Sequence, residues 1–142
     1  VYALKLRGMK RIFLINRTKE RAADLASDFG ASIEVVDFPD LPGVLAGANL
    51  LINATSLGMR GQPPLAIDLA PLPPDSVVND IVYVPLETAV IRAARARGLR
   101  AVSGVGMLLH QAVPGFEHWF GIKPCVTPEL RGVVEADVAA AG

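Results

Sequence analysis

The sequence predicts an α/β fold in which a doubly wound parallel sheet carries helices on both faces. Two observations support this prediction. Short apolar segments rich in strand-forming residues recur along the chain, and longer helical segments separate them. Several of the short segments are apolar without alternation, which is typical of strands buried on both faces of a parallel sheet.

Five short segments have the character of strands, at residues 11–15, 33–36, 50–52, 77–82 and 99–102. Helical patterns cover residues 1–7, 19–29, 87–97, 106–120 and 128–140, and a weaker helix or turn covers 40–48. Thr18 is predicted to cap the helix that follows it. Residues 58–75 are rich in proline and glycine and predict a loop.

The first residues read as the last turns of a helix that Gly8 ends. From this pattern we expect that chain precedes Val1, and that the sheet lacks its first, central strand in this chain. Unpaired strand edges inside a core are costly. We therefore expect the absent strand to come from a longer protein or from another chain.

Composition excludes several classes of protein. Lys plus Arg and Asp plus Glu both number 14, so no basic excess favours a nucleic acid or an anionic membrane. Cys125 is the only cysteine, which fits a reducing cytoplasm. His110 and His118 have no carboxylates at ligand spacing, so we expect no metal site.

In such sheets ligands bind at the carboxyl ends of the strands. After the first strand come Asn16, Arg17 and Thr18, and Arg21 follows one turn into the helix. An acid at this place binds the ribose of NAD, whereas an arginine accepts the 2′-phosphate of NADP. On spacing alone, solvated arginines beside a capped helix explain the pattern equally well. The helix dipole disfavours cations there, and so favours an anionic ligand.

The other strand ends carry weaker signals. Thr55 and Ser56 follow the third strand and suit a backbone close to a cofactor, although a plain turn uses the same residues. Tyr83 follows the fourth strand, and its phenol either binds a polyol substrate or borders the core.

Gly104 and Gly106 follow the fifth strand, without the third glycine of a phosphate-binding loop. They suggest a tight turn and close approach of the backbone to a flat ring. Gln111 lies one helical turn beyond Met107, and it either binds hydroxyl groups in a cleft or is a surface residue.

Taken in order, the motifs Asn-Arg-Thr-x-x-Arg, Asn-Ala-Thr-Ser-x-Gly-Met, Asp-x-x-Tyr-x-Pro-x-x-Thr and Gly-x-Gly-Met-Leu-x-x-Gln resemble those of the shikimate dehydrogenase family. The resemblance runs from Val1 to about Pro128. It implies a Rossmann-like, NADP-dependent, cytoplasmic oxidoreductase of aromatic amino-acid biosynthesis, which reduces 3-dehydroshikimate to shikimate.

The resemblance also implies roles for single residues. Cofactor-binding residues would be Asn16, Arg17, Thr18 and Arg21 at the 2′-phosphate, Thr55 and Ser56 along the dinucleotide, and Ile81, Gly104 and Met107 at the nicotinamide. Tyr83 and Gln111 would contact the substrate. The family's catalytic lysine and aspartate lie in a preceding substrate domain, so we expect no catalytic residue in this chain.

We expect residues 1–126 to form the nucleotide-binding domain and residues 127–142 a helix that packs on the substrate domain. Three alternatives stay open. They are a quinate/shikimate dehydrogenase with relaxed cofactor use, a non-catalytic nucleotide-binding module, and another NADP-linked reductase such as a methylene-tetrahydrofolate or glutamyl-tRNA enzyme. Tyr83 and Gln111 weigh against the third. The sequence leaves the oligomeric state open, a homodimer included.

Overall fold

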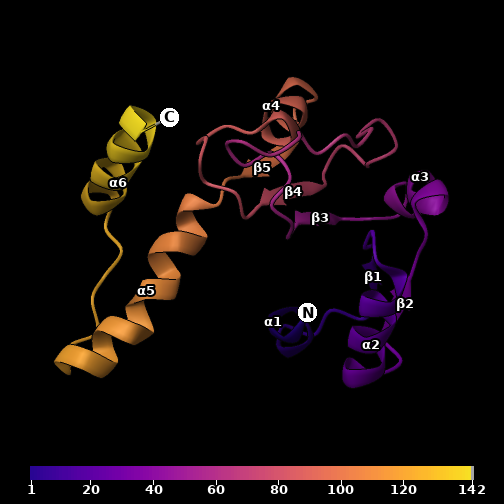
Figure 1. The fold of residues 1–142 in the computed structure, drawn as a ribbon, viewed down its shortest axis with the longest axis horizontal. Helices are drawn as coiled ribbons and strands as arrows, with labels where there is room; N and C mark the ends of the chain where they lie inside the picture. The colour runs from indigo at the N-terminus through magenta and orange to yellow at the C-terminus, as the bar shows by residue number, and fades with distance from the viewer. Residues whose placement is uncertain (142) are drawn as a thin grey trace. The chain divides into compact units, whose positions relative to one another are not determined.

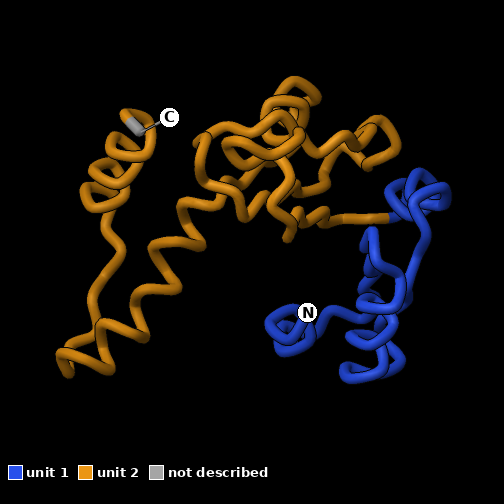
Figure 2. The backbone as a smooth tube through the Cα atoms, in the orientation of Figure 1, with its two compact units in different colours: residues 1–47 blue, residues 48–142 orange. Residues whose placement is uncertain are grey.

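The computed structural model describes residues 1–141 and confirms the α/β class with parallel strands (Figure 1). The chain divides into two compact units, residues 1–47 and 48–142, and each is described by itself (Figure 2). All five predicted strands are present. Four are shorter than predicted by one or two residues, and the strand at 50–52 is longer because it includes Asn53.

The first unit contains a two-stranded parallel sheet. Its elements are α1 (Tyr2–Leu6), β1 (Ile12–Leu14), α2 (Lys19–Phe29), β2 (Ile33–Val35), the 3₁₀ helix η1 (Phe38–Asp40) and α3 (Leu41–Leu45). Ile12 pairs with Ile33, and both are buried, as apolar strand residues should be beneath a helix. Ala22 on α2 is 2% exposed, so α2 meets the sheet through a small side chain.

The second unit contains a three-stranded parallel sheet in the order β3-β4-β5. Its elements are β3 (Leu50–Asn53), β4 (Val77–Asp80), α4 (Ala89–Ala96), β5 (Arg100–Val102), α5 (Val105–Phe120) and α6 (Pro128–Ala141). α4 packs on β4 and β5 through Val90, Ile91 and Ala94, which are all buried. This side of the sheet therefore has an apolar cover.

The strands form two parallel sheets, as expected of a doubly wound sheet that lacks its central strand. Within residues 1–141, neither β1 nor β2 pairs with a strand of the second unit. That a strand from outside this chain joins the two sheets stays a prediction.

The last helix belongs to the second unit, where it contacts α5. Val138 on α6 is 7% exposed, whereas Val133 is 67% exposed. Part of the apolar face of α6 is thus covered within the unit, and part is open to solvent. No helix within residues 1–141 combines the length and apolar character needed to cross a membrane.

Candidate functional site

The junction between β1 and α2 is shaped by Asn16. Its side-chain Oδ1 accepts a hydrogen bond of 3.3 Å from the backbone N–H of Thr18. Thr18 is the N-cap residue of α2, as predicted, with extended backbone dihedrals. The capping hydrogen bond that its side-chain oxygen was expected to accept is wrong, because no side chain of the described residues caps α2. The positive end of this helix therefore lacks a capping side chain.

Two arginines flank this helix start, and both are exposed. The ion pairs among the described residues of the first unit join Arg11 to Glu34 and Lys19 to Asp37, so neither involves Arg17 or Arg21. The hydrogen bond of 2.6 Å from Lys19 to Asp37 raises the pKa of the lysine ammonium above its usual value. The two guanidinium groups are the cations of this junction without a described carboxylate partner.

The carboxyl ends of β3 and β4 are joined by a buried polar contact. Asn53 and Asp80 are the last residues of these strands, and the parallel register pairs them. Asn53 Nδ2 donates to Asp80 Oδ1 at 2.9 Å, and the residues are 4% and 0% exposed. We call Asn53, Asp80 and Thr88 the polar cluster.

Asp80 accepts two further hydrogen bonds. The backbone N–H of Val82 donates to its Oδ1 at 3.0 Å, and the Thr88 hydroxyl donates to its Oδ2 at 2.6 Å. Thr88 in turn caps α4, since its Oγ1 accepts from the N–H of Ile91. Three donors satisfy the buried acid, and none of these donors is a cation.

Asn53 also folds the loop that follows β3. Its Oδ1 accepts from the backbone N–H of Thr55 at 3.1 Å and from the Thr55 hydroxyl at 2.7 Å. Its Nδ2 donates to the carbonyl oxygen of Leu57 at 3.0 Å. Thr55 and Ser56 themselves are exposed. The loop therefore exposes two predicted cofactor-binding residues to solvent. The hydrogen bonds of Asn53 determine its shape.

Gly104 lies directly against the chain that continues from β4. A Cβ at this position would stand 2.1 Å from the carbonyl oxygen of Ile81 and 2.7 Å from that of Val82. The N–H of Gly104 donates to the Val82 oxygen at 3.2 Å. Only glycine fits here, and the neighbour that requires it is protein backbone. The sequence suggested a tight turn here and close approach of the backbone to a flat ring, and the approach to a ring stays a prediction.

Three predicted residues have no described polar contact that would fix a role. Tyr83 is partly buried, Met107 is 37% exposed and Gln111 is exposed. The structure brings Ile81 and Gly104 together and connects both to the polar cluster through Val82. The predicted phosphate-binding residues lie in the other unit.

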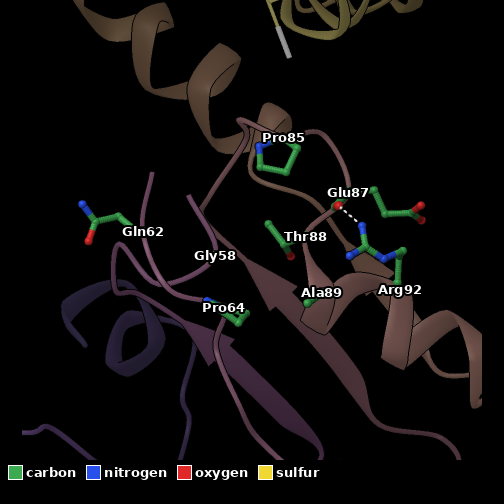
Figure 3. A pocket seen from close by; sticks show the side chains of 8 residues that line it. All are labelled: Gly58, Gln62, Pro64, Pro85, Glu87, Thr88, Ala89 and Arg92. Atoms are coloured by element: carbon green, nitrogen blue, oxygen red, sulfur yellow. Dashed lines mark hydrogen bonds between the residues drawn. The ribbon is translucent and has the colours of Figure 1, made fainter. Parts of the chain in front are cut away.

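An open hollow of about 160 Å³ lies at the start of α4 (Figure 3). Its lining comprises Gly58, Gln62, Pro64, Pro85, Glu87, Thr88, Ala89 and Arg92, none of them a predicted site residue. The guanidinium of Arg92 donates to the backbone oxygen of Glu87 at 2.9 Å, so its direction is set by the protein itself. Thr88 links this hollow to the polar cluster.

The sequence alone predicted no role for Asn53, Asp80 or Thr88. Asp80 and Thr88 stand at the two ends of the Asp-x-x-Tyr-x-Pro-x-x-Thr motif, and Asn53 opens the Asn-Ala-Thr-Ser motif. An acid within a largely apolar strand is a signal, because a carboxylate in that place needs donors. Within residues 1–141, no three side chains of His, Cys, Asp or Glu gather as a metal site requires.

Known proteins match this chain along nearly its whole length. A family model described as shikimate/quinate 5-dehydrogenase matches residues 1–60, and one described as the shikimate 5′-dehydrogenase C-terminal domain matches residues 104–126. Shikimate dehydrogenase (NADP(+)) of Rhodopseudomonas palustris is 59% identical over 139 residues, or 98% of this chain. The chain belongs to the shikimate dehydrogenase family. The resemblance found in the sequence is thereby confirmed.

The chain spans about half the length of the curated relatives it matches. It covers 50% of the Rhodopseudomonas palustris protein and 48% of the Nitrobacter hamburgensis shikimate dehydrogenase (NADP(+)), to which it is 61% identical over 138 residues. Identity at this level over nearly all of one chain indicates a shared fold for the matched part.

Solved structures give the same result. The chain matches a Corynebacterium glutamicum quinate dehydrogenase in complex with NAD with a TM-score of 0.83 and 33% identity, over 95% of this chain and 49% of that one. It matches a Thermus thermophilus shikimate 5-dehydrogenase in complex with NADP(H) and shikimate with a TM-score of 0.77 and 30% identity, over 99% and 49%. These neighbours confirm the predicted Rossmann-like class.

Proposed function

We propose that this chain is the NADP-binding part of a shikimate dehydrogenase, which reduces 3-dehydroshikimate to shikimate with NADPH. The observation that carries the proposal is the β1–α2 junction. Two exposed arginines without a described carboxylate partner stand beside a helix start without a side-chain cap. Guanidinium groups and a helix N-terminus together favour a phosphate group.

The residues present fit this cofactor. No acid stands at the end of β1, where one would bind the 2′-hydroxyl of NAD, and Arg17 stands there instead. We assign Asn16, Arg17, Thr18 and Arg21 to the 2′-phosphate end. The internal hydrogen bond of Asn16 fixes the turn that presents Arg17, so its role is to shape the junction.

The second unit would bind the nicotinamide end of the cofactor and the substrate. Thr55 and Ser56 border the dinucleotide path, Ile81, Gly104 and Met107 border the nicotinamide, and Tyr83 and Gln111 hydrogen-bond substrate hydroxyl groups. When bound, NADPH supplies the hydride that reduces the ketone. The protein's part is to orient the ketone and the ring, since reaction rates depend steeply on such alignment. We assign no catalytic residue to this chain.

The proposal extends to the domain bounds, the cellular compartment and the oligomeric state. Residues 1–126 would bind the nucleotide, and the exposed part of the α6 face, which includes Val133, would pack on a substrate domain. A lone cysteine and a neutral net charge support a cytoplasmic enzyme that acts on small molecules. Light scattering would distinguish a monomer from a homodimer.

A hybrid enzyme tests the proposal, with this chain in place of the matching part of the Rhodopseudomonas palustris protein. We expect it to oxidise shikimate with NADP and to prefer NADP to NAD. Replacing Arg17 or Arg21 by alanine removes charge-assisted hydrogen bonds, so the dissociation constant of 2′,5′-ADP should rise about 10- to 100-fold in calorimetry. NAD binding should stay unchanged.

Arg11→Ala is the matched control. Arg11 is an exposed arginine of the same unit that precedes β1 and pairs with Glu34. It should leave 2′,5′-ADP binding unchanged. Equal affinities of the hybrid enzyme for NADP and NAD would refute the assignment of the two arginines.

The second candidate is a quinate/shikimate dehydrogenase with relaxed cofactor use. The likeness to the quinate dehydrogenase in complex with NAD, at 33% identity, favours it. Comparing kcat/KM of the hybrid enzyme for shikimate and quinate, each with NADP and NAD, separates the two. An inactive hybrid enzyme that still binds 2′,5′-ADP would instead indicate a non-catalytic nucleotide-binding module.

A further inference from the structure

The polar cluster combines features that stability alone does not require. Asp80 is 0% exposed, at the end of an otherwise largely apolar strand. A buried carboxylate is costly even when hydrogen bonds satisfy it, whereas an apolar side chain would pack at no such cost. Fully satisfied buried networks do, however, hold their surroundings in a single arrangement. The segments that the polar cluster joins therefore indicate its role.

The cluster joins three segments that are distant in the sequence. Asn53 ends β3 and folds the loop of Thr55 and Ser56. Asp80 ends β4 and binds the N–H of Val82. Thr88 begins α4. One carboxylate thus sets the relative positions of two strand ends and a helix start.

The chain after β4 is held from two sides. Asp80 accepts from the N–H of Val82. Gly104 lies against the carbonyl groups of Ile81 and Val82, and its N–H donates to the Val82 oxygen. Ile81 and Tyr83 flank Val82 in the sequence. Their side chains are directed by a peptide that has little freedom to rotate, and these are the residues proposed for the nicotinamide and the substrate.

We propose that Asp80 is a positioning residue. With Asn53 and Thr88 it keeps the Ile81–Tyr83 segment and the Thr55–Ser56 loop aligned for hydride transfer, without touching either ligand. This inference rests on the proposed function. Asn53, Asp80 and Thr88 are buried, whereas Thr55 and Ser56, which would border the dinucleotide, are exposed.

Four variants of the hybrid enzyme test the inference. Asp80→Asn keeps the size of the side chain but replaces one acceptor oxygen with a donor, so that a single oxygen faces three donors. Thr88→Val removes that hydroxyl at similar volume, and Thr88→Ser keeps it. Ser76→Ala is the matched control. Ser76 is also 0% exposed and lies just before the first residue of β4, at the end opposite Asp80. Its hydroxyl donates to the backbone oxygen of Ala48.

We expect Asp80→Asn and Thr88→Val to lower kcat at least about tenfold, because small misplacements of reacting groups slow reactions steeply. Thr88→Ser, which keeps the hydroxyl, should retain most of the wild-type kcat. Ser76→Ala should leave kcat within about twofold although it also loses one buried hydrogen bond. The dissociation constant of 2′,5′-ADP should stay the same in all four variants, since this probe reports the arginine junction alone.

Amide hydrogen exchange in the 142-residue chain supplies a readout that does not depend on activity. Asp80→Asn should speed exchange at Val82 and Thr55 at least about tenfold while leaving Phe13 in the first unit unchanged. Unchanged exchange together with unchanged kcat in Asp80→Asn and Thr88→Val would overturn the inference, as would an equal loss of kcat in Ser76→Ala. A wild-type hybrid enzyme without activity or 2′,5′-ADP binding would refute the proposed function instead, and exchange alone would then decide whether Asp80 holds these segments.

Discussion

Replacing Gly104 by alanine should destabilise the second unit, because the new methyl group meets backbone. Its Cβ would lie 2.1 Å from the Ile81 oxygen and 2.5 Å from the Ile81 carbonyl carbon. Ordinary contacts between carbon and oxygen are about 3.3 Å or longer, so one segment must move by roughly 1 Å. Ile81 and Val82 cannot move easily, since Asp80 holds the N–H of Val82.

The magnitude follows from these contacts. Forcing an extra methyl group into a packed site costs about 1–3 kcal/mol. Gly104 has a φ of −69°, which alanine adopts without strain, so the cost comes from the clash alone. A loss of about 2 kcal/mol should lower the melting temperature by roughly 8 °C, at about 4 °C per kcal/mol for a chain of this size.

Circular dichroism melts of the 142-residue chain measure this effect, and Gly115→Ala is the control. Gly115 lies within α5, and a Cβ there meets nothing within 4 Å. Alanine should therefore stabilise that helix by about 0.5–1 kcal/mol. If Gly104→Ala melts at or above the wild-type temperature, the close approach to Ile81 is wrong.

Other substitutions give further tests. Asp37→Asn should lower the pKa of Lys19 toward its ordinary value of 10.5, as followed by NMR titration, because the carboxylate is what raises it. The Lys19–Asp37 pair stabilises the folded state fully below pH 10.5, and this stabilisation is lost as the pH rises through the higher pKa of Lys19 in the folded state. Ile91→Ala should lower the unfolding free energy by about 2–5 kcal/mol in urea titrations, since Ile91 is 0% exposed. Val133→Ala, at a side chain 67% exposed, should change it by less than about 0.5 kcal/mol.

Local signals predicted the elements well. Gly30, Gly98 and Gly121 directly follow the predicted helices at 19–29, 87–97 and 106–120, and all three adopt a positive φ, of 84°, 72° and 68°. This conformation is open to glycine and closed to most side chains, so a single residue type marks the end of a helix. Strand positions were equally readable, because apolar runs between polar turns are local as well.

Non-local features could not be predicted in the same way. The pairing partner of each strand depends on the fold as a whole, and no short pattern states it. The expected capping bond of Thr18 was wrong although its position was right. The side chain of Asn16 accepts from the N–H of Thr18, so a neighbouring residue shapes the turn in place of the hydroxyl.

The polar cluster shows where register adds what residue types cannot. Asn53 and Asp80 are 27 residues apart, and each alone resembles an ordinary turn residue after a strand. Parallel register places them side by side as the last residues of β3 and β4, and burial then obliges the acid to find donors. The amide of Asn53 and the hydroxyl of Thr88 meet that need, and in doing so they fix the two segments that carry Thr55 and Tyr83. The residues that shape a ligand site can therefore be sought one to three positions before those that would contact the ligand, at the last paired residues of adjacent strands.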